Sequence, residues 1–162
     1  MTIYLIGPSG VGKSACASHA STVLQAEYRA LDDLCRGREG NWTLCQQTLD
    51  RIESEARECG AFFIIDIGAG TQHRCQVGLQ QYLTPRRQRV VLIYAQPSEA
   101  IQRNPLGPTR SVEEYRRTEY ETRMALYSIA DHRIVDVSGK SKDDAKALFS
   151  KFISEAFGVA AR

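Results

Sequence analysis

The sequence predicts an α/β fold, in which a five-stranded parallel sheet lies between layers of helices. Three observations predict it. Short apolar runs, of the kind that suits strands buried on both faces, recur along the chain. Segments with helical spacing separate these runs, and no repeat or low-complexity segment interrupts the alternation. Such an alternation favours a parallel sheet covered by helices, and the length suits a single domain over residues 1–162.

Residues 2–6, with the sequence TIYLI, form the first predicted strand, which ends at a turn rich in glycine. A helix follows the turn and is expected to end near residue 25. A weaker strand is predicted over residues 27–31. Asp32 and Asp33 come directly after it, where a strand of an open α/β sheet delivers residues to a ligand crevice.

The alternation continues to the end of the chain. Apolar residues at helical spacing predict a helix over residues 43–59, which Gly60 ends. The strongest strand, AFFIIDI, covers residues 61–67 and leads into Gly68-Ala69-Gly70, where we expect a flexible turn. The remaining predicted elements are strands over residues 89–95 and 134–137, a long charged helix over residues 111–130, and a last helix over residues 141–157 that begins with a capping box of Ser141 and Asp144.

Composition and charge argue against several classes of protein. With 43% hydrophobic and 25% charged residues, the chain is of the ordinary globular kind. Its net charge of +2 shows no sign asymmetry between the halves, so we expect neither a nucleic-acid nor a membrane partner. The five cysteines are scattered and form no CxxC pair, which argues against a disulfide framework or a zinc site. Residues 1–6 run straight into Gly7 without the pattern of a signal peptide, so we expect a cytoplasmic protein.

Residues 7–14, GPSGVGKS, satisfy the pattern G-x-x-x-x-G-K-[ST] between a predicted strand and a predicted helix. Glycines allow the backbone to curl so that successive N–H groups point at phosphate oxygens, and the helix presents its positive end. We expect Lys13 to reach the β- and γ-phosphates of ATP and the Ser14 hydroxyl to bind Mg²⁺. The chain is thus predicted to have a three-layer P-loop NTPase fold that holds the nucleotide through Gly7, Gly10, Val11, Gly12, Lys13, Ser14 and Ala15.

Asp66 closes the run FFIID, in which four apolar residues precede an acid, as in a Walker B strand. In that role its carboxylate would hold Mg²⁺ through water. The alternative is a strand-end aspartate that caps the next turn.

If the bound nucleotide is used to phosphorylate a second molecule, the protein also needs groups that hold this acceptor. Asp32 or Asp33 could accept a hydrogen bond or a proton from an acceptor hydroxyl, and Asp32 is the preferred candidate for this catalytic role. Both lie at the start of residues 32–60, which we interpret as the substrate-binding segment. The alternative is that they cap a surface helix, since aspartate favours that position.

Arg103 and Arg110 flank the loop RNPLGPTR, within residues 103–112, which we interpret as a small lid. A closing lid that carries arginine can neutralise charge on the transferred phosphoryl group and expel water, which would make both arginines catalytic. A solvated basic loop is the alternative.

Arg123 stands next to an apolar stretch, Met124-Ala125-Leu126-Tyr127. There its guanidinium could bind a substrate carboxylate with two hydrogen bonds. It could equally pair with Glu119 or Glu121 on the surface of the predicted helix.

With these residues assembled, the chain resembles the shikimate kinase family, among the nucleoside-monophosphate-kinase-like proteins, over nearly its whole length. IYLIGPSGVGKS is similar to the family's first strand and phosphate loop, FIIDIGAGTQ to its triple-glycine substrate loop, and RNPLGPTR to its lid. EYRALDDL places Asp32 at the family's substrate-binding aspartate, and TRMALYSIADHRI places Arg123 at the arginine that binds the substrate carboxylate. The resemblance implies a kinase that uses ATP and Mg²⁺ and binds its substrate through Asp32, Gly68, Ala69, Gly70 and Arg123.

The chain departs from the family pattern at three positions. Ala30 stands where the family has an aspartate that supports magnesium, and Asp66 is the candidate to compensate. Ala69 replaces the central glycine of the substrate loop. Thr43, preceded by Trp42, stands where the family has a second substrate arginine.

We therefore expect a monomeric kinase that transfers the γ-phosphoryl group of Mg-ATP to a hydroxyl of a small anionic metabolite, with shikimate the leading candidate. A nucleotide-binding regulatory protein that has lost acceptor turnover is the alternative, and the three departures favour it. A nucleoside-monophosphate kinase is a third hypothesis. It would need a base-recognition pocket, for which residues 32–42 are few.

Overall fold

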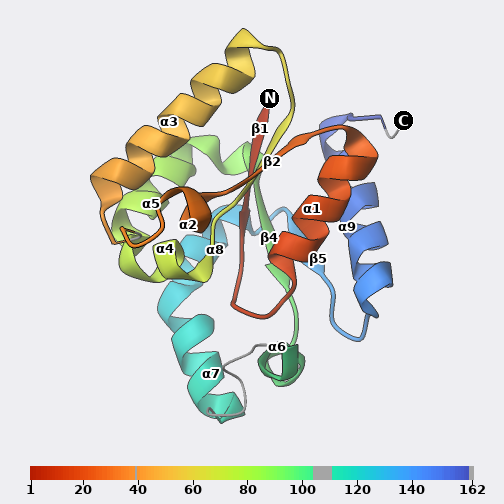
Figure 1. Cartoon of the computed structure of the whole chain (residues 1–162). Coiled ribbons are helices and arrows are strands. Elements are labelled where there is room, and N and C mark those ends of the chain that lie inside the picture. The colour runs from red at the N-terminus through yellow and green to blue at the C-terminus, as the bar shows by residue number, and fades with distance from the viewer. Residues whose placement is uncertain (39, 104–110, 161–162) are drawn as a thin grey trace.

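A computed structural model describes residues 1–38, 40–103 and 111–160. It confirms the predicted α/β fold: a sheet of five strands in the order β2-β3-β1-β4-β5, with every neighbouring pair parallel (Figure 1). The strands are β1 (Thr2–Ile6), β2 (Glu27–Ala30), β3 (Phe63–Asp66), β4 (Val90–Tyr94) and β5 (Ile134–Asp136).

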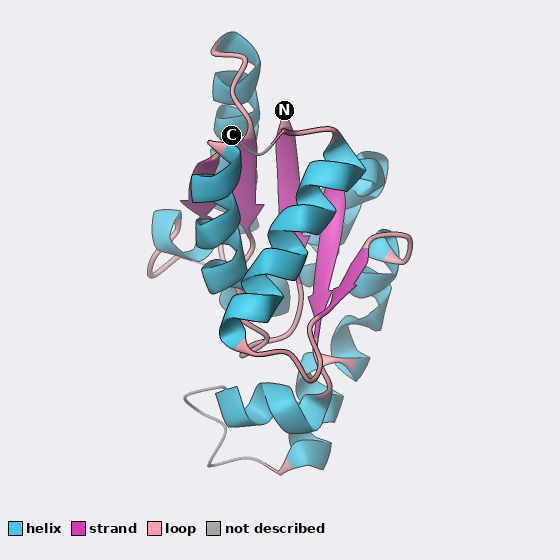
Figure 2. Ribbon diagram, turned by 90° about the vertical axis from the view of Figure 1, so that its right-hand side faces the viewer, coloured by secondary structure: helices cyan, strands magenta, loops and turns pink. Residues whose placement is uncertain are grey.

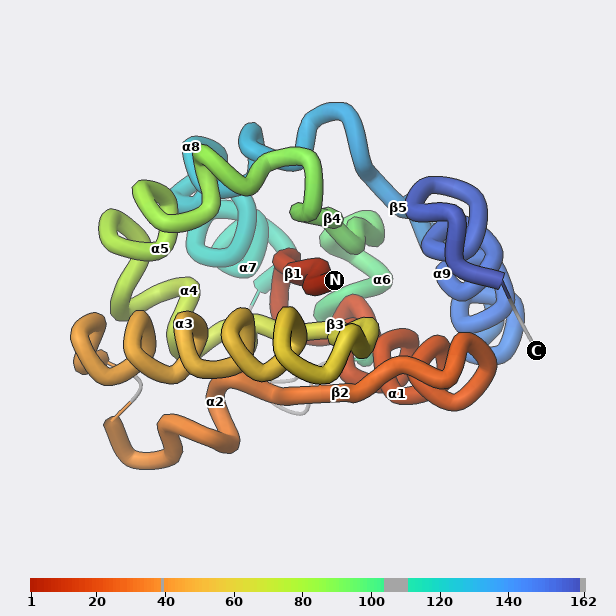
Figure 3. Tube along the Cα trace, turned by 90° about the horizontal axis from the view of Figure 1, so that it is seen from above, coloured from red at the N-terminus to blue at the C-terminus, as the bar shows by residue number. Residues whose placement is uncertain are grey.

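Helices cover both faces of the sheet, which gives three layers. Figure 3 shows α1 and α9 together beside one face, while α3 and α5 lie over the other. The described helices are α1 (Lys13–Leu24), α2 (Leu31–Leu34), α3 (Trp42–Glu58), α4 (Ala69–Arg74), α5 (Gln76–Leu83), α6 (Pro97–Arg103), α7 (Val112–Glu119), α8 (Met124–Tyr127) and α9 (Lys142–Phe157), with 3₁₀ turns η1 (Thr84–Arg89), η3 (Glu121–Arg123) and η4 (Ser128–Ala130).

The sheet separates two hydrophobic cores. Because side chains alternate along a strand, β1 sends Tyr4 and Ile6 into the core beneath α3 and α5, and Ile3 and Leu5 into the core beneath α1 and α9. All five residues of β1 are buried, as expected for a central strand of a parallel sheet. Because β1 is packed on both faces, the position at which the strand ends and the glycine-rich loop begins is fixed.

The strands run the same way, so their carboxyl ends meet at one edge of the molecule (Figure 2). Asp66 lies beside Leu5 of β1 on one side and Ala30 of β2 on the other. Helices α6 and α7 lie beyond this edge (Figure 1). The edge therefore gathers the glycine-rich loop, Asp66 and the residues that follow β2, as expected for a ligand site in an open α/β sheet.

Two predictions about local structure were wrong. The helix predicted over residues 111–130 is broken at Tyr120 into α7, η3, α8 and η4, because tertiary contacts fix the chain there: the Tyr120 hydroxyl donates to the Ala95 carbonyl, and the Tyr127 hydroxyl to that of Glu119. Ala69 and Gly70 do not form a flexible turn but begin α4. Ser141 is confirmed as the N-cap of α9, since its hydroxyl oxygen accepts from the Asp144 N–H.

No helix in the described part of the chain is long and apolar enough to cross a membrane.

Candidate active site

The glycine-rich loop, residues 7–12, connects β1 to α1 in a conformation that depends on glycine at particular positions. Gly7 has φ 146°, and a Cβ there would overlap the main-chain carbonyl oxygen of Ile93 on β4. Gly12 has φ 92° and is the N-cap of α1, so the chain turns into the helix in the left-handed region. The loop therefore lies tight against the sheet, at the N-terminal end of α1, where an anion is stabilised.

Lys13, the first residue of α1, folds back over the loop. Its Nζ donates to the carbonyl oxygens of Gly7 at 2.9 Å and Pro8 at 2.8 Å, and the residue is 7% exposed. Burial lowers the pKa of the Lys13 ammonium, while the carboxylate of Asp66 acts against that shift. The ammonium group is thus held at the loop by carbonyl dipoles and a neighbouring carboxylate.

Ser14 and Asp66, the two residues expected to hold Mg²⁺, are hydrogen-bonded to each other. The Ser14 hydroxyl donates to Asp66 Oδ2 at 2.6 Å, and the Tyr28 hydroxyl lies 3.4 Å from the same oxygen. Burial, followed by the Asp66 charge, raises the pKa of Tyr28 to about 12. Asp66 Oδ1 is buried and has no hydrogen-bond partner among the described residues.

These groups fit a magnesium ion. Mg²⁺ in nucleotide sites usually takes one or two protein oxygens, with waters and phosphate oxygens completing its shell. Ser14 Oγ and the unpartnered Oδ1 of Asp66 supply such oxygens. Ala30 lies directly beside Asp66 in the register of β2 and β3, so the second carboxylate that the family pattern places at residue 30 would have adjoined Asp66.

A pocket of about 470 Å³ opens on this group and is within the range of small-molecule sites. One wall is the glycine-rich loop with the first turn of α1, and Asp66, Gly68 and Ala69 line it further on. Besides Lys13, three basic residues contribute to its lining, Arg103 from α6 and Lys142 and Lys146 from α9. The pocket is therefore basic beside the phosphate loop, as a polyanion requires. Sequence reasoning missed both lysines, because nothing local distinguishes them from solvated residues of a surface helix.

Arg103 lies at this pocket, 3.4 Å from Glu99 and 3.1 Å from the Lys140 carbonyl oxygen. Arg110 and most of the predicted lid lie outside the described residues.

Asp32 does not cap its own helix; it caps α4. Its Oδ2 accepts from the Gly70 N–H at 3.1 Å, and its Oδ1 from the Thr71 N–H at 3.3 Å and the Thr71 hydroxyl at 2.5 Å. A Cβ on Gly68 would overlap this carboxylate. Asp32 therefore ties the end of β2 to the Gly68–Gly70 segment. Asp33 is exposed and pairs with Arg36 at 2.8 Å, so the structure separates the two aspartates.

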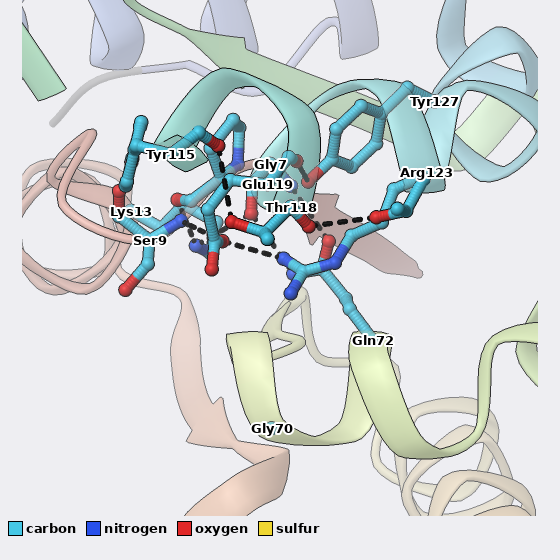
Figure 4. A network of polar contacts seen from close by, with 12 residues as sticks. Gly7, Ser9, Lys13, Gly70, Gln72, Tyr115, Thr118, Glu119, Arg123 and Tyr127 are labelled. Carbon is cyan, nitrogen blue, oxygen red and sulfur yellow. Dashed lines mark hydrogen bonds and ion pairs between the residues drawn. The ribbon is translucent and has the colours of Figure 1, made fainter. Parts of the chain in front are cut away.

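Arg123 is buried, at 3% exposed, and its Nη1 donates to Glu119 Oε2 at 2.8 Å. The same Glu119 oxygen accepts the main-chain N–H of Ser9, in the glycine-rich loop, at 3.1 Å (Figure 4). Tyr115 donates from its hydroxyl to the Ser9 carbonyl. Two roles were expected for Arg123, a ligand for a substrate carboxylate or a partner in an ion pair. The structure contains the ion pair, but its acid, Glu119, is buried and does not lie on the helix surface.

Gln72 is another site residue that sequence reasoning missed. Its side-chain amide donates to the carbonyl oxygens of Gly7 and Ile67 and accepts from the Gly7 N–H. It thereby joins α4 to the start of the glycine-rich loop. A buried glutamine carries no sequence signal of this role.

The structure shows where the residues that depart from the family pattern lie. Thr43 is exposed in the first turn of α3, while Trp42 covers Gly78 of α5, where a Cβ would overlap the indole ring. Ala69 is the first residue of α4. Thr43, which stands where the family has an arginine, is thus exposed, while the aromatic ring of the preceding Trp42 packs against α5.

The glycine-rich loop, the basic pocket beside it and the carboxylate of Asp66 at the end of β3 together define a protein of the P-loop class. No protein-family model and no curated protein sequence matches the chain. Among solved structures it is similar to the shikimate kinase from Acinetobacter baumannii in complex with shikimate, at 20% identity and a TM-score of 0.67, covering 97% of this chain and 93% of that one.

It is also similar to the shikimate kinase from Aquifex aeolicus, at 18% identity and a TM-score of 0.60, with coverages of 98% and 99%. An uncharacterized protein from Eubacterium ventriosum matches at 11% identity and a TM-score of 0.58, with coverages of 96% and 98%. The chain has the shikimate kinase-like P-loop fold over its whole length.

Proposed function

We propose that this chain is a kinase that transfers the γ-phosphoryl group of Mg-ATP to a hydroxyl group of a small metabolite. The observation that carries the proposal is the pairing of Ser14 with Asp66 at the mouth of the glycine-rich loop, where a buried carboxylate oxygen has no partner in the described structure. A basic pocket adjoins the pair. The fold shared with two shikimate kinases supports the same reading.

In this proposal the main-chain N–H groups of the loop and the Lys13 ammonium bind the phosphates, and Ser14 and Asp66 hold the metal ion. When bound there, Mg²⁺ would neutralise the charge of the phosphate groups. Arg103, together with Arg110 of the lid, neutralises the transferred group. The bond between the γ-phosphorus and its bridging oxygen breaks and leaves its electron pair on ADP, a bond to the acceptor oxygen forms, and the hydroxyl proton passes to the carboxylate of Asp32.

Asp32 positions the acceptor in this account. A carboxylate has about four lone-pair sites, and Gly70 and Thr71 use three of those on Asp32. The remaining site can accept the acceptor hydroxyl, at a carboxylate that the N-terminal end of α4 already holds in place. The adjoining Gly68, Ala69 and Gly70 would supply main-chain contacts, and Asp33 takes no part.

Shikimate is the first acceptor to assay, because one of the similar structures is described in complex with it. A coupled assay of ADP release should show turnover that depends on both Mg²⁺ and an acceptor, tested with shikimate, other hydroxylated compounds and nucleoside monophosphates. Lys13→Ala should abolish phosphate binding, whereas Lys151→Ala, an exposed lysine paired with Glu155 on α9, should not. Nucleotide affinity unchanged in Lys13→Ala would contradict the assignment of the loop.

A second candidate is a nucleotide-binding regulatory protein without acceptor turnover. The observation that favours it is that both expected acceptor groups, Asp32 and Arg123, have partners within the chain. Tight binding of Mg-ATP, with no acceptor able to stimulate ADP release, would support this candidate and contradict the kinase proposal.

We also infer a cytoplasmic location and a monomer. The location is supported by the five cysteines, all of which are free thiols.

A further inference from the structure

Helix α7 holds the middle of the glycine-rich loop through two of its side chains. The main-chain N–H of Ser9 donates to Glu119 Oε2 at 3.1 Å, and the Tyr115 hydroxyl donates to the Ser9 carbonyl. Tyr115 and Glu119 are four residues apart, so they lie one turn apart on the same face of α7. One helix therefore fixes both main-chain polar groups of Ser9, as can be followed in Figure 4.

Ser9 lies among residues with unusual backbone freedom. It lines the pocket together with Gly10 and Gly12, whose φ values of 83° and 92° are in the left-handed region. Because glycine has more backbone freedom than any other residue, ordering a glycine-rich loop costs conformational entropy. A contact that fixes Ser9 in the free protein removes part of this cost before a ligand binds, which is how preorganisation raises affinity.

Glu119 is a buried acid to which the proposed reaction gives no role. It is 6% exposed, and a buried carboxylate lowers stability unless a charge and hydrogen bonds compensate it. Arg123 Nη1 supplies the charge at 2.8 Å, and the Tyr127 hydroxyl donates to the Glu119 main-chain carbonyl at 3.0 Å. Apolar side chains can often replace a buried ion pair without loss of stability. The presence of an acid at this position is explained if its bond to Ser9 has a use.

The ion pair leaves the phosphate-binding site basic. Burial and the Asp66 charge act most strongly on the pKa of the Lys13 ammonium. The next two charges act in opposite directions, since Arg123 lowers this pKa and Glu119 raises it. Glu119 thus supplies an acceptor for the Ser9 N–H, while its charge is balanced by that of Arg123.

We propose that Tyr115 and Glu119 are positioning residues of the phosphate-binding site: by fixing Ser9, they hold the glycine-rich loop in its binding conformation before the nucleotide arrives. The inference rests on the phosphate-binding part of the proposed function and not on the transfer of the phosphoryl group. It adds α7, which is far from the loop in the sequence, to the elements that determine nucleotide affinity.

The first test removes single hydroxyl groups. Tyr115→Phe loses the bond to the Ser9 carbonyl. Tyr120→Phe, the matched control, loses a bond from the C-cap of α7 to the Ala95 carbonyl. In titration calorimetry with Mg-ADP, the Kd should be about three- to tenfold higher in Tyr115→Phe, the effect of one hydrogen bond, and within about twofold of the wild type in Tyr120→Phe. Equal Kd values in the two variants would overturn the proposal, because a general loss of stability affects both.

The second test keeps or removes the acceptor at residue 119. Two double variants, Glu119→Gln/Arg123→Met and Glu119→Met/Arg123→Met, both remove the whole ion pair, so neither leaves an unpaired buried charge. Only the first keeps a side-chain oxygen that can accept from the Ser9 N–H. The second should bind Mg-ADP about three- to tenfold more weakly than the first. If the two bind Mg-ADP equally well, Glu119 does not position the loop.

Relaxation of the main-chain amides, measured by NMR, reports on the loop itself. Without ligand, the amides of Gly10 and Gly12 should be more mobile in Tyr115→Phe than in the wild type or Tyr120→Phe, and Mg-ADP should remove the difference. Loop amides as rigid in ligand-free Tyr115→Phe as in the wild type would contradict the proposal, because the loop would then be ordered without this contact.

Failure of the kinase proposal has a different signature. In that case no acceptor stimulates ADP release in any variant, while the differences in Kd for Mg-ADP remain. Where an acceptor does turn over, Tyr115→Phe should raise KM for ATP and leave kcat within about twofold of the wild type, because the bound nucleotide orders the loop. A fall in kcat with KM unchanged would overturn the positioning role.

Discussion

At the scale of the residue, the two oxygens of the Asp66 carboxylate have different surroundings. Oδ2 accepts from the hydroxyls of Ser14 and Tyr28, while Oδ1 is buried without a partner in the described structure. A buried acceptor left unpaired costs free energy, so its retention is explained if a metal shell uses it. We therefore propose that metal binding depends on Asp66.

Asp66→Asn should therefore raise the Mg²⁺ concentration needed for ATP binding by about tenfold or more, because it removes the negative charge next to the ion. Calorimetric titration of ATP at a series of Mg²⁺ concentrations measures the effect. Asp33→Asn, which alters an exposed carboxylate paired with Arg36, is the control. An unchanged Mg²⁺ requirement in Asp66→Asn would remove Asp66 from the metal site.

Ala30→Asp tests the same site by gain of function. The new carboxylate would adjoin Asp66, since Ala30 is its register partner on β2. Two neighbouring carboxylates repel each other but bind a divalent ion more tightly. ATP binding should weaken without Mg²⁺ and require less Mg²⁺ than in the wild type. If the two proteins respond to Mg²⁺ alike, the metal does not bind at this end of the strands.

At the scale of the element, helix α4 depends on a cap supplied from elsewhere in the chain. It begins at Ala69, and its N-cap residue, Gly68, offers no side-chain hydrogen bond. The carboxylate of Asp32 satisfies the N–H groups of Gly70 and Thr71 instead.

Asp32→Ala should destabilise the protein by about 1–2 kcal/mol, the cost of a lost helix cap. Urea unfolding measures it. Asp33→Ala, which removes a neighbouring exposed acid, should stay within about 0.5 kcal/mol of the wild type. Equal free energies of unfolding in the two variants would mean that the cap contributes nothing. Gly68→Ala should behave like Asp32→Ala, because its Cβ would displace the carboxylate.

The elements also show which parts of the structure can be predicted from sequence patterns. The glycine-rich loop and the parallel sheet could be predicted, because a fixed motif and buried apolar runs are local signals. The break at Tyr120 could not, since it depends on a hydrogen bond to Ala95, far away in the sequence. Ser9 and Glu119 are 110 positions apart, so no spacing rule connects them. The four-residue spacing of Glu119 and Arg123 was an available signal for their ion pair.

At the scale of the whole molecule, Glu53 joins α3 to the centre of the sheet and to η1. It is 7% exposed, accepts the Tyr4 hydroxyl from β1, and pairs with Arg86 at 3.1 Å and Arg89 at 2.9 Å. Burial alone would raise the pKa of Glu53, but hydrogen bonds from Arg86 and Tyr4 and the arginine charges outweigh it and hold the pKa below its usual 4.5.

This shift predicts a specific dependence of stability on pH. A depressed carboxylate pKa contributes stability that is fully present above the unfolded value of 4.5 and is lost as the pH falls through the folded value. Glu53→Gln lacks this contribution, so its deficit in free energy of unfolding should be largest above pH 4.5 and shrink at lower pH. Urea unfolding across that range measures it, with Glu155→Gln, an exposed acid, as the control. A deficit independent of pH would contradict the assignment.

The central claim, that this P-loop fold transfers a phosphoryl group to a hydroxyl acceptor, is tested most directly by following the γ-phosphate of labelled ATP. The wild type is incubated with Mg²⁺, ATP labelled on its γ-phosphate, and a panel of uncharged and carboxylate-bearing hydroxyl compounds, with Lys13→Ala in parallel. The account predicts that label moves into an organic phosphate ester with at least one of these acceptors, and that Lys13→Ala forms none. Label that stays in ATP, or appears only as inorganic phosphate whatever the acceptor, would contradict it.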